Sequence, residues 1–433
     1  MSNTGTAILI LIGAFLLLVI LRVQIAFAVA IAASLCLLYL KLPLTTVVTQ
    51  MVKGLYSFSL MAVPFFICMG SIMGAGGISD KLIELADSFV GWMHGGLAMV
   101  NIVASYFFGG ISGSAAADTA SIGKLMIPMM VSAGYDADFS TAVTITSSVE
   151  GLLVPPSHNM VIYCTAAGGV SVGALFMAGY LPGALLAISL MIFSYVISMK
   201  RHYPKGEAFS VKKVLKQLKT SVWALLAILI VVVGVVVGIF TATESAAIAV
   251  LYSLFVSMVI YRELDFKGLW AVFGECIDTL AIVLILCGTS NVFGFCLTYL
   301  HVPDLAAKAI TSLTTNKIAL TLLINLILLV LGMIMDMAPI ILIATPILFP
   351  LAQSIGIGAI QFGIMMVLNC GIGLLTPPVG TVLFIGSAVS GVKIEDIVKA
   401  TLPFYLAMLI TLMLISFVPE ITLLIPRLVG YPV

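Results

Sequence analysis

Long runs of apolar residues, separated by short polar stretches, follow one another along most of the chain. These runs are long enough to cross a hydrocarbon core of roughly 30 Å, which takes about 20 residues of helix. No strand-like alternation is present, so helices are the only structure that can satisfy the backbone in lipid. We therefore predict an all-α polytopic membrane protein with about ten to twelve spans and several shorter helical pieces. Clear runs are residues 7–21, 25–40, 222–240, 245–260 and 318–335.

Two of the polar interruptions are flanked by apolar arms too short to span. Residues 109–119, rich in Gly and Ser and ending in an Asp-Thr pair, predict a re-entrant hairpin near 97–133. Residues 332–339 predict a second hairpin near 317–353. Non-helical backbone at membrane depth is tolerated only where it is buried in protein, so both tips should face the interior.

Two further interruptions contain a pair of prolines. Proline lacks a backbone donor and blocks the preceding turn, so a helix unwinds where it occurs. Residues 147–159, with Pro155-Pro156, therefore predict a broken helix near 140–165. Residues 370–381, with Pro377-Pro378, predict its counterpart near 360–386.

The landmarks of the first half recur in the second half at one constant spacing, which we call the repeat interval. Gly151-Leu-Leu-Val-Pro-Pro-Ser matches Gly373-Leu-Leu-Thr-Pro-Pro-Val, and Gly110 matches Gly332 at the same spacing. Duplicated halves with helix breaks at equivalent depths are typical of secondary transporters. We predict two inverted repeats, each opening with two scaffold helices, over residues 1–199 and 221–433, joined by a linker over 200–220.

Charge is scarce and unevenly distributed. Only 9% of residues are charged and 62% are hydrophobic, which excludes a soluble globule. Seven basic residues between positions 200 and 219 place that linker in the cytoplasm, with an amphipathic helix over 211–219 along the interface. The only basic residue in the segment 419–433 is Arg427, as expected for an inverted second copy. The seven cysteines have no metal-ligand spacing, so we expect no transition metal.

Unwound turns supply the chemistry of an ion site. Their unpaired carbonyl oxygens are ligands for hard cations, Ser and Thr add hydroxyls, and Gly permits close approach. The helix N-termini at the same breaks favour an anionic substrate. We therefore predict two quasi-equivalent Na⁺ sites with a substrate cleft between them. The ligands are Ser112, Ser114, Gly151 and Val154 at one site, and Met335, Asp336, Gly373 and Thr376 at the other.

Carboxylates at membrane depth are costly and are functional by default. Asp118 and Asp336 are therefore expected to act at the site, although each could instead cap a helix end. The sequence leaves open the roles of Glu150, Glu244, His158 and Lys124.

Five strings resemble the large membrane subunit, of the DctM type, of tripartite ATP-independent periplasmic (TRAP) transporters. They are Phe-Ser-Leu-Met-Ala-Val-Pro-Phe-Phe (58–66), Ser-Gly-Ser-Ala-Ala-Ala-Asp-Thr (112–119), Val-Pro-Pro-Ser (154–157), Phe-Thr-Ala-Thr-Glu (240–244) and Gly-Leu-Leu-Thr-Pro-Pro-Val-Gly (373–380). The resemblance covers nearly the whole chain. It implies an ion-transporter fold with an elevator-like transport domain in a bacterial inner membrane. Where many members have proline, this chain has Ala242, which lies outside the predicted site.

The same resemblance implies partners and residue roles. It implies Na⁺-coupled uptake of an organic acid delivered by a periplasmic binding protein of the DctP type. A small four-helix membrane subunit of the DctQ type should accompany it as a separate polypeptide. Ser112, Ser114, Gly151, Gly373 and Thr376 match the ion-binding motifs, and Asp118, Ser157 and Asp336 match the polar groups expected to face substrate.

The sequence also allows two alternative functions. Gly110-Ile-Ser112-Gly113 matches the GxSG string of intramembrane serine proteases, with His158 as a possible base, but a protease leaves the second hairpin unexplained. A sodium–dicarboxylate symporter that needs no binding protein is the closer rival. The chain has no phosphate-binding loop for ATP, so the Na⁺ gradient must supply the energy, and we expect no cofactor and no nucleic-acid partner. The sequence does not identify the acid, and C4-dicarboxylates, sugar acids and sialic acid are all candidates.

Overall fold

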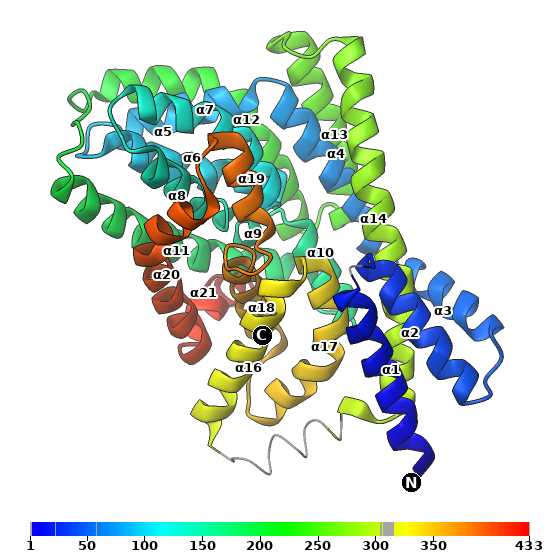
Figure 1. The fold of residues 1–433 in the computed structure, drawn as a ribbon. Helices are drawn as coiled ribbons and strands as arrows, with labels where there is room; N and C mark the ends of the chain where they lie inside the picture. Colours follow the sequence, from blue (N-terminus) through cyan, green and yellow to red (C-terminus); the bar gives the residue numbers. More distant parts are fainter. Residues whose placement is uncertain (1, 22, 58, 304, 306–315, 433) are drawn as a thin grey trace.

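The computed structural model describes residues 2–21, 23–57, 59–303, 305 and 316–432. Within these ranges the chain consists of helices and their connections, and the one β-pairing is an isolated bridge between His94 and Lys205 (Figure 1). The predicted all-α fold is confirmed.

The first half opens with helices of unequal length that end in a sharp bend. The axes of the helices over residues 62–75 and 78–90 differ by 72° across the two-residue break between them. The elements are α1 (Ser2–Ile20), α2 (Ile25–Tyr39), α3 (Thr45–Leu55), the 3₁₀ turn η1 (Ser59–Met61), α4 (Ala62–Ala75) and α5 (Ile78–Val90).

The second half opens with three helices, of which the first and the third are longer than any opening helix of the first half. The helix α14 runs along one side of the molecule in Figure 1 and lies against α2, α3 and α4. When the halves are aligned at the repeat interval, α14 covers in one helix what α3 and α4 cover in two. The elements are α12 (Val211–Val236), α13 (Ala242–Phe255), continued by the π-helical turn η2 (Val256–Ile260), and α14 (Phe266–Tyr299).

The basic linker differs from its prediction. Residues 211–219 do not form a separate interfacial helix but are the first turns of α12. The backbone N–H of Lys213 donates to the Ser210 hydroxyl at 3.5 Å, which caps the helix. No Pro or Gly follows before Gly234, so nothing ends the helix at residue 220, and the connection between the halves shortens to residues 201–210.

The remaining helices form two series with the same spacing. Helix bounds recur at the repeat interval at the end of α6 and α16, at the start of α7 and α17, and at the start of α11 and α20. The first series is α6 (Gly96–Ser112), α7 (Ala115–Ser132), α8 (Ala137–Ser147), α9 (Glu150–Leu153), α10 (His158–Ala166) and α11 (Val172–Lys200). The second is α16 (Lys317–Ile334), α17 (Met337–Ser354), α18 (Ala359–Gly373), α19 (Thr381–Ser390), α20 (Ile394–Phe417) and α21 (Glu420–Leu428).

Fewer helices qualify as spans than the sequence predicts. By length and composition, seven helices in the described ranges could cross a membrane, or eight if α4 and α5 form one bent span. The prediction of about ten to twelve spans is higher than this count because several apolar stretches form short helices, among them α2, α18 and α19.

The two hairpins lie at different ends of the view in Figure 1. The α6–α7 pair is in the upper part, the α16–α17 pair is in the lower part, and α9, α10 and α18 lie between them. The opposite orientation of the two repeats stays a prediction.

Candidate functional site

The tip of the first hairpin is a two-residue break between α6 and α7. Gly113 adopts a left-handed conformation with φ of 59°, which favours glycine, and ends α6. The Ser114 hydroxyl then accepts a hydrogen bond from the Ala117 N–H at 3.3 Å and caps α7. The Ser112 hydroxyl lies 3.4 Å from both the backbone N–H and the carbonyl oxygen of Ser114. Two hydroxyls and the N-terminus of α7 therefore meet at this tip.

The tip of the second hairpin is the equivalent break between α16 and α17. Met335 is extended, and the Asp336 carboxylate accepts a hydrogen bond from the Met337 N–H at 2.9 Å. Asp336 is therefore a helix cap, separated from the cap Ser114 by the repeat interval. It is the counterpart of Ser114, whereas Asp118 lies one turn inside α7.

The first broken helix leaves backbone oxygens without partners. The N–H of Val154 donates to the Glu150 carbonyl at 2.9 Å, and the chain then extends through Pro155 and Pro156 to α10. Proline at position 155 removes the donor that would reach the Gly151 carbonyl in a continuous helix. No other donor reaches the carbonyls of Gly151 or Val154 among the residues that the structure describes. These oxygens are free for a cation.

The second broken helix satisfies more of its own backbone. The Gly373 carbonyl accepts from the Thr376 N–H at 2.8 Å, and the Leu374 carbonyl accepts from the Val382 N–H at 3.2 Å. The Thr376 hydroxyl donates to the Ile372 carbonyl at 2.8 Å. The two broken helices are therefore alike in position and differ in how many oxygens they leave free. The bonds between the paired prolines are cis in both.

Each hairpin touches its own broken helix through a pair of glycines. A Cβ added to Gly109 would lie 2.3 Å from the Gly151 Cα, and a Cβ added to Gly373 would lie 2.5 Å from the Gly332 Cα. Real Cβ atoms do not approach other atoms this closely, so each contact requires glycine. Gly151, Gly332 and Gly373 thus hold hairpin and broken helix together.

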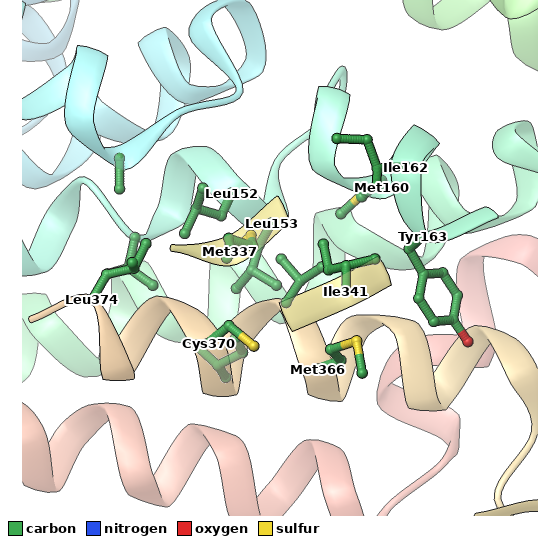
Figure 2. Packing of buried hydrophobic residues seen from close by; sticks show 14 of the residues in the cluster. Leu152, Leu153, Met160, Ile162, Tyr163, Met337, Ile341, Met366, Cys370 and Leu374 are labelled. Carbon is green, nitrogen blue, oxygen red and sulfur yellow. The ribbon is translucent and has the colours of Figure 1, made fainter. Parts of the chain in front are cut away.

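The broken helices of the two halves also pack on each other. A Cβ added to Gly371 would lie 2.7 Å from Val149 and 3.0 Å from the Leu152 side chain. Figure 2 shows Leu152 and Leu153 facing Met337, Cys370 and Leu374 of the second half. The Tyr163 hydroxyl donates to the Ala359 carbonyl at 2.6 Å, which joins α10 to the start of α18. Residues far apart in the sequence thus form one buried layer.

A cavity of about 650 Å³ opens where both tips and both breaks converge. Ser112, Ser114 and Asp336 of the predicted site line it. The other predicted residues do not line it. Gly151 and Gly373 form the glycine contacts, Thr376 is half-buried, and the rest are buried, namely Val154, Met335, Asp118 and Ser157. A second cavity, of about 340 Å³, lies apart from the tips between α3, α10, α14 and α17.

Two carboxylates are completely buried behind the first tip. Asp118 accepts a long hydrogen bond of 3.4 Å from Ser105, and its other oxygen is unpartnered. Both carboxylate oxygens of Glu150 are unpartnered as well. A Cβ added to Gly151 would lie 3.7 Å from Asp118 Oδ2 and 3.9 Å from Ser112 Oγ, so Asp118 borders the first predicted ion site. Neither carboxylate lines the cavity.

The structure also places the other three residues whose roles the sequence left open, after Glu150. Glu244 forms a capping box with Thr241 at the start of α13, accepting from the Thr241 N–H at 2.8 Å. His158 lines the cavity beside Gly113, and its Nδ1 is unpartnered. Lys124 lines the same cavity. Glu244 is therefore structural, while the other two face the site.

Sequence reasoning missed the wall formed by the opening helices. Gly70 and Ser71 of α4 and Glu275 and Thr279 of α14 line the cavity opposite the hairpins. A carboxylate within a 34-residue apolar helix is itself a signal of function, which makes Glu275 detectable from sequence. The serine and glycines carry no such signal, because small residues in membrane helices usually serve packing.

Comparisons with known proteins agree with this arrangement. A family model described as "Tripartite ATP-independent periplasmic transporter, DctM component" matches residues 12–421. The chain is 44% identical to the protein YgiK of Salmonella typhimurium over 88% of its length and 87% of that protein. It is 39% identical to the sialic acid TRAP transporter large permease protein SiaM of Vibrio cholerae, over 88% of its length and 90% of that protein. It is 41% identical to the isethionate TRAP transporter permease protein DctMQ of Oleidesulfovibrio alaskensis, over 88% of its length and 60% of that longer protein.

A solved structure shares the fold. The YdaH transporter of Alcanivorax borkumensis, described as having an unusual topology, superposes with a TM-score of 0.62 at 14% sequence identity and covers 89% of each chain. Hairpin tips, broken helices and a shared cavity thus occur in a chain whose match to one transporter family runs almost from end to end. The chain belongs to the DctM family, the large permease subunits of tripartite ATP-independent periplasmic transporters.

Proposed function

We propose that this permease imports an organic acid together with Na⁺ by an elevator-type movement of two inverted repeats. The protein is a multi-pass protein of the bacterial inner membrane. The observation that carries the proposal is the convergence of Ser112, Ser114 and Asp336, from two separate hairpins, on one cavity. Such a pairing of tips across halves gives a solute and its coupling ions a common place to bind.

Oxygen chemistry supports Na⁺ as the coupling ion. The unpartnered carbonyls of Gly151 and Val154 and the hydroxyls of Ser112 and Ser114 are hard ligands. Asp118 places a carboxyl group directly behind them. The second site is assigned to Met335, Asp336, Gly373 and Thr376, where one carboxylate is already at the tip. Na⁺ there would have to compete with the Thr376 N–H for the Gly373 carbonyl, which predicts a weaker second site.

Helix N-termini support an anionic substrate. The starts of α7, α10 and α17 lie around the cavity, and the positive ends of helices attract carboxylates and sulfonates. Two of the relatives reported above are named for sialic acid and isethionate, both of which are anions. An organic acid of the C4-dicarboxylate, sugar-acid or sialic-acid type is the proposed substrate for this chain.

The proposed mechanism separates a fixed part from a moving part. Helices α4 and α14 form one wall of the cavity, and the hairpins with α10 and α19 form the other. We assign the first wall to the scaffold and the second to the transport domain. A periplasmic binding protein would deliver the acid to the closed tips, and a small four-helix subunit would brace the scaffold.

Reconstitution into proteoliposomes tests the proposal. The permease is inserted with its small subunit, and uptake of sialic acid, isethionate and succinate is followed with the binding protein encoded beside it. The expected result is uptake that requires an inward Na⁺ gradient, fails with K⁺, and requires the binding protein. Uptake of free substrate without the binding protein would favour the sodium–dicarboxylate symporter, and uptake unaffected by Na⁺ would contradict the proposal.

A further inference from the structure

One basic side chain stands in the cavity without a partner. Lys124 lies on α7 and lines the space between the hairpin tips and the α4–α14 wall. Two carboxylates, Glu275 and Asp336, line the same space. Neither forms an ion pair with Lys124, and no hydrogen bond from its ammonium group is found within the described ranges. Lys124 is therefore a cation inside a membrane protein that the protein itself does not neutralise.

The position of Lys124 on α7 directs it toward the tip. Ser114, Ala117, Ser121 and Lys124 follow one another at intervals of three or four residues, so they lie along one face of the helix. All four line the cavity, which means that this face borders it over its length. Ala117 and Ser121 are small and leave room between Lys124 and the hairpin tip. Lys124 is ten residues beyond the cap Ser114, about 15 Å along the helix, and helical side chains lean back toward the N-terminus.

The Lys124 side chain is exposed to the open cavity, so a ligand that enters the cavity can pair with its charge. Ionisable residues inside membrane segments by default mark a substrate or ion path, and the missing partner has the opposite charge. A Na⁺ ion cannot serve, because it carries the same sign as the lysine. The partner must be an anion, and the cavity is large enough for a small organic acid, within the usual range of about 300–1,000 Å³ for ligand pockets.

We propose that Lys124 is a substrate-binding residue that receives an anionic group of the transported acid, while the Na⁺-bearing tips hold its other end. This inference deepens the proposed function and rests on it. A carboxylate or sulfonate would accept a charge-assisted hydrogen bond from the Lys124 ammonium group. The oxygen-rich tip at Ser112, Ser114 and Asp336 would then face the hydroxyl or second acidic group of the same molecule. Acids with polar groups at both ends are therefore favoured over simple monocarboxylates.

Thermal unfolding of the purified permease tests this assignment. Sialic acid, isethionate and succinate are each titrated in Na⁺ against wild type, Lys124→Gln, Lys124→Arg and the control Lys216→Gln, which removes an exposed lysine of α12. The expected result is stabilisation of wild type by at least one anion and a dissociation constant about 10- to 100-fold higher for Lys124→Gln. Lys124→Arg should retain part of the affinity, and Lys216→Gln should retain all of it.

Separate readouts distinguish this inference from the proposed function. Stabilisation by Na⁺ alone should be the same in Lys124→Gln as in wild type, since the lysine is not an ion ligand. Wild-type protein that is stabilised by an anion but not by Na⁺ would contradict the proposed Na⁺ coupling. It would not affect the assignment of Lys124 as a substrate-binding residue. Equal anion affinity of Lys124→Gln and wild type, or no anion response in wild type, would overturn the inference. The same loss in Glu275→Gln would also overturn it, because Lys124 would then serve a structural ion pair.

Discussion

The hydroxyl of Thr411 donates a hydrogen bond of 3.2 Å to the hydroxyl of Ser189, and the two residues are 222 positions apart. They occupy α20 and α11, whose first residues are separated by the same interval. Two equivalent positions can touch only where an axis relating the copies passes between them. This contact therefore marks where a pseudo-twofold axis between the repeats would run.

Paired cysteines should link the two helices at this point. Ser189→Cys with Thr411→Cys, in a background without the seven native cysteines, is expected to form an intramolecular disulfide on mild oxidation, because the two hydroxyls are 3.2 Å apart. The measurement is the shift of the oxidised band in non-reducing electrophoresis. Each single cysteine is the control. If the pair does not cross-link, the pseudo-twofold axis does not pass between Ser189 and Thr411.

The glycine contact of the second half should not tolerate a methyl group. In Gly373→Ala the new Cβ would lie 2.5 Å from the Gly332 Cα, so backbone must move. Overpacking of this kind costs about 1–3 kcal/mol, and we expect a lower melting temperature with loss of Na⁺ stabilisation. Gly274→Ala is the matched control, since nothing lies within 4 Å of its Cβ. A Gly373→Ala protein as stable and active as the control would show that the contact is unimportant.

Removing the charge of Asp336 should weaken Na⁺ binding without unfolding the hairpin. In Asp336→Asn the amide oxygen can still accept from the Met337 N–H, so the cap of α17 survives. The lost carboxylate charge should raise the Na⁺ concentration needed for half-maximal stabilisation about tenfold or more. Asp265→Asn, at the cap of α14 that accepts from the Gly268 N–H at 2.6 Å, is the control. Equal Na⁺ responses in both variants would exclude Asp336 as a ligand.

Acid should weaken the contact of Asp136 with Arg201 and Tyr203, which lies at the start of the connection between the halves. The Tyr203 hydroxyl, at 2.6 Å, and the Arg201 guanidinium, at 2.7 Å, lower the pKa of Asp136. Because the folded pKa lies below the unfolded value of about 3.9, this stabilisation is present above that pH and is lost as the pH falls through the lowered pKa. The pair is exposed, so the effect should stay below about 1 kcal/mol.

Melting temperatures measured between neutral and acidic pH check this prediction. Tyr203→Phe removes the larger cause of the lowered pKa, so its melting temperature should fall less on acidification than that of wild type. An identical pH profile for the two proteins would exclude the contact as a source of acid sensitivity.

The helix ends at the two tips could be predicted because the signals that end these helices are local. The first hairpin was expected over 97–133, and the helices there, α6 and α7, run from Gly96 to Ser132. The second was expected over 317–353, and α16 and α17 run from Lys317 to Ser354. Gly113 and Ser114 end one helix and begin the next through their own backbone and side chain. Such features can be found without knowing the rest of the fold.

The composition of the cavity was less predictable because it depends on packing between distant segments. Asp118 was expected to face substrate, and it is fully buried, since it does not lie on the face of α7 formed by Ser114, Ala117, Ser121 and Lys124 that lines the cavity. Glu275 enters the cavity only because α14 packs beside α4 and α17. Local sequence patterns contain no information on which helices become neighbours.

Direct binding of radioactive sodium to the purified permease tests the central claim, that backbone oxygens freed at the helix breaks bind Na⁺. The account predicts saturable binding at two sites, with one site lost in Pro155→Ala, where the restored N–H can donate to the Gly151 carbonyl. The surface variant Lys216→Gln should bind as wild type does. Absence of saturable binding, or binding unchanged by Pro155→Ala, would contradict the account.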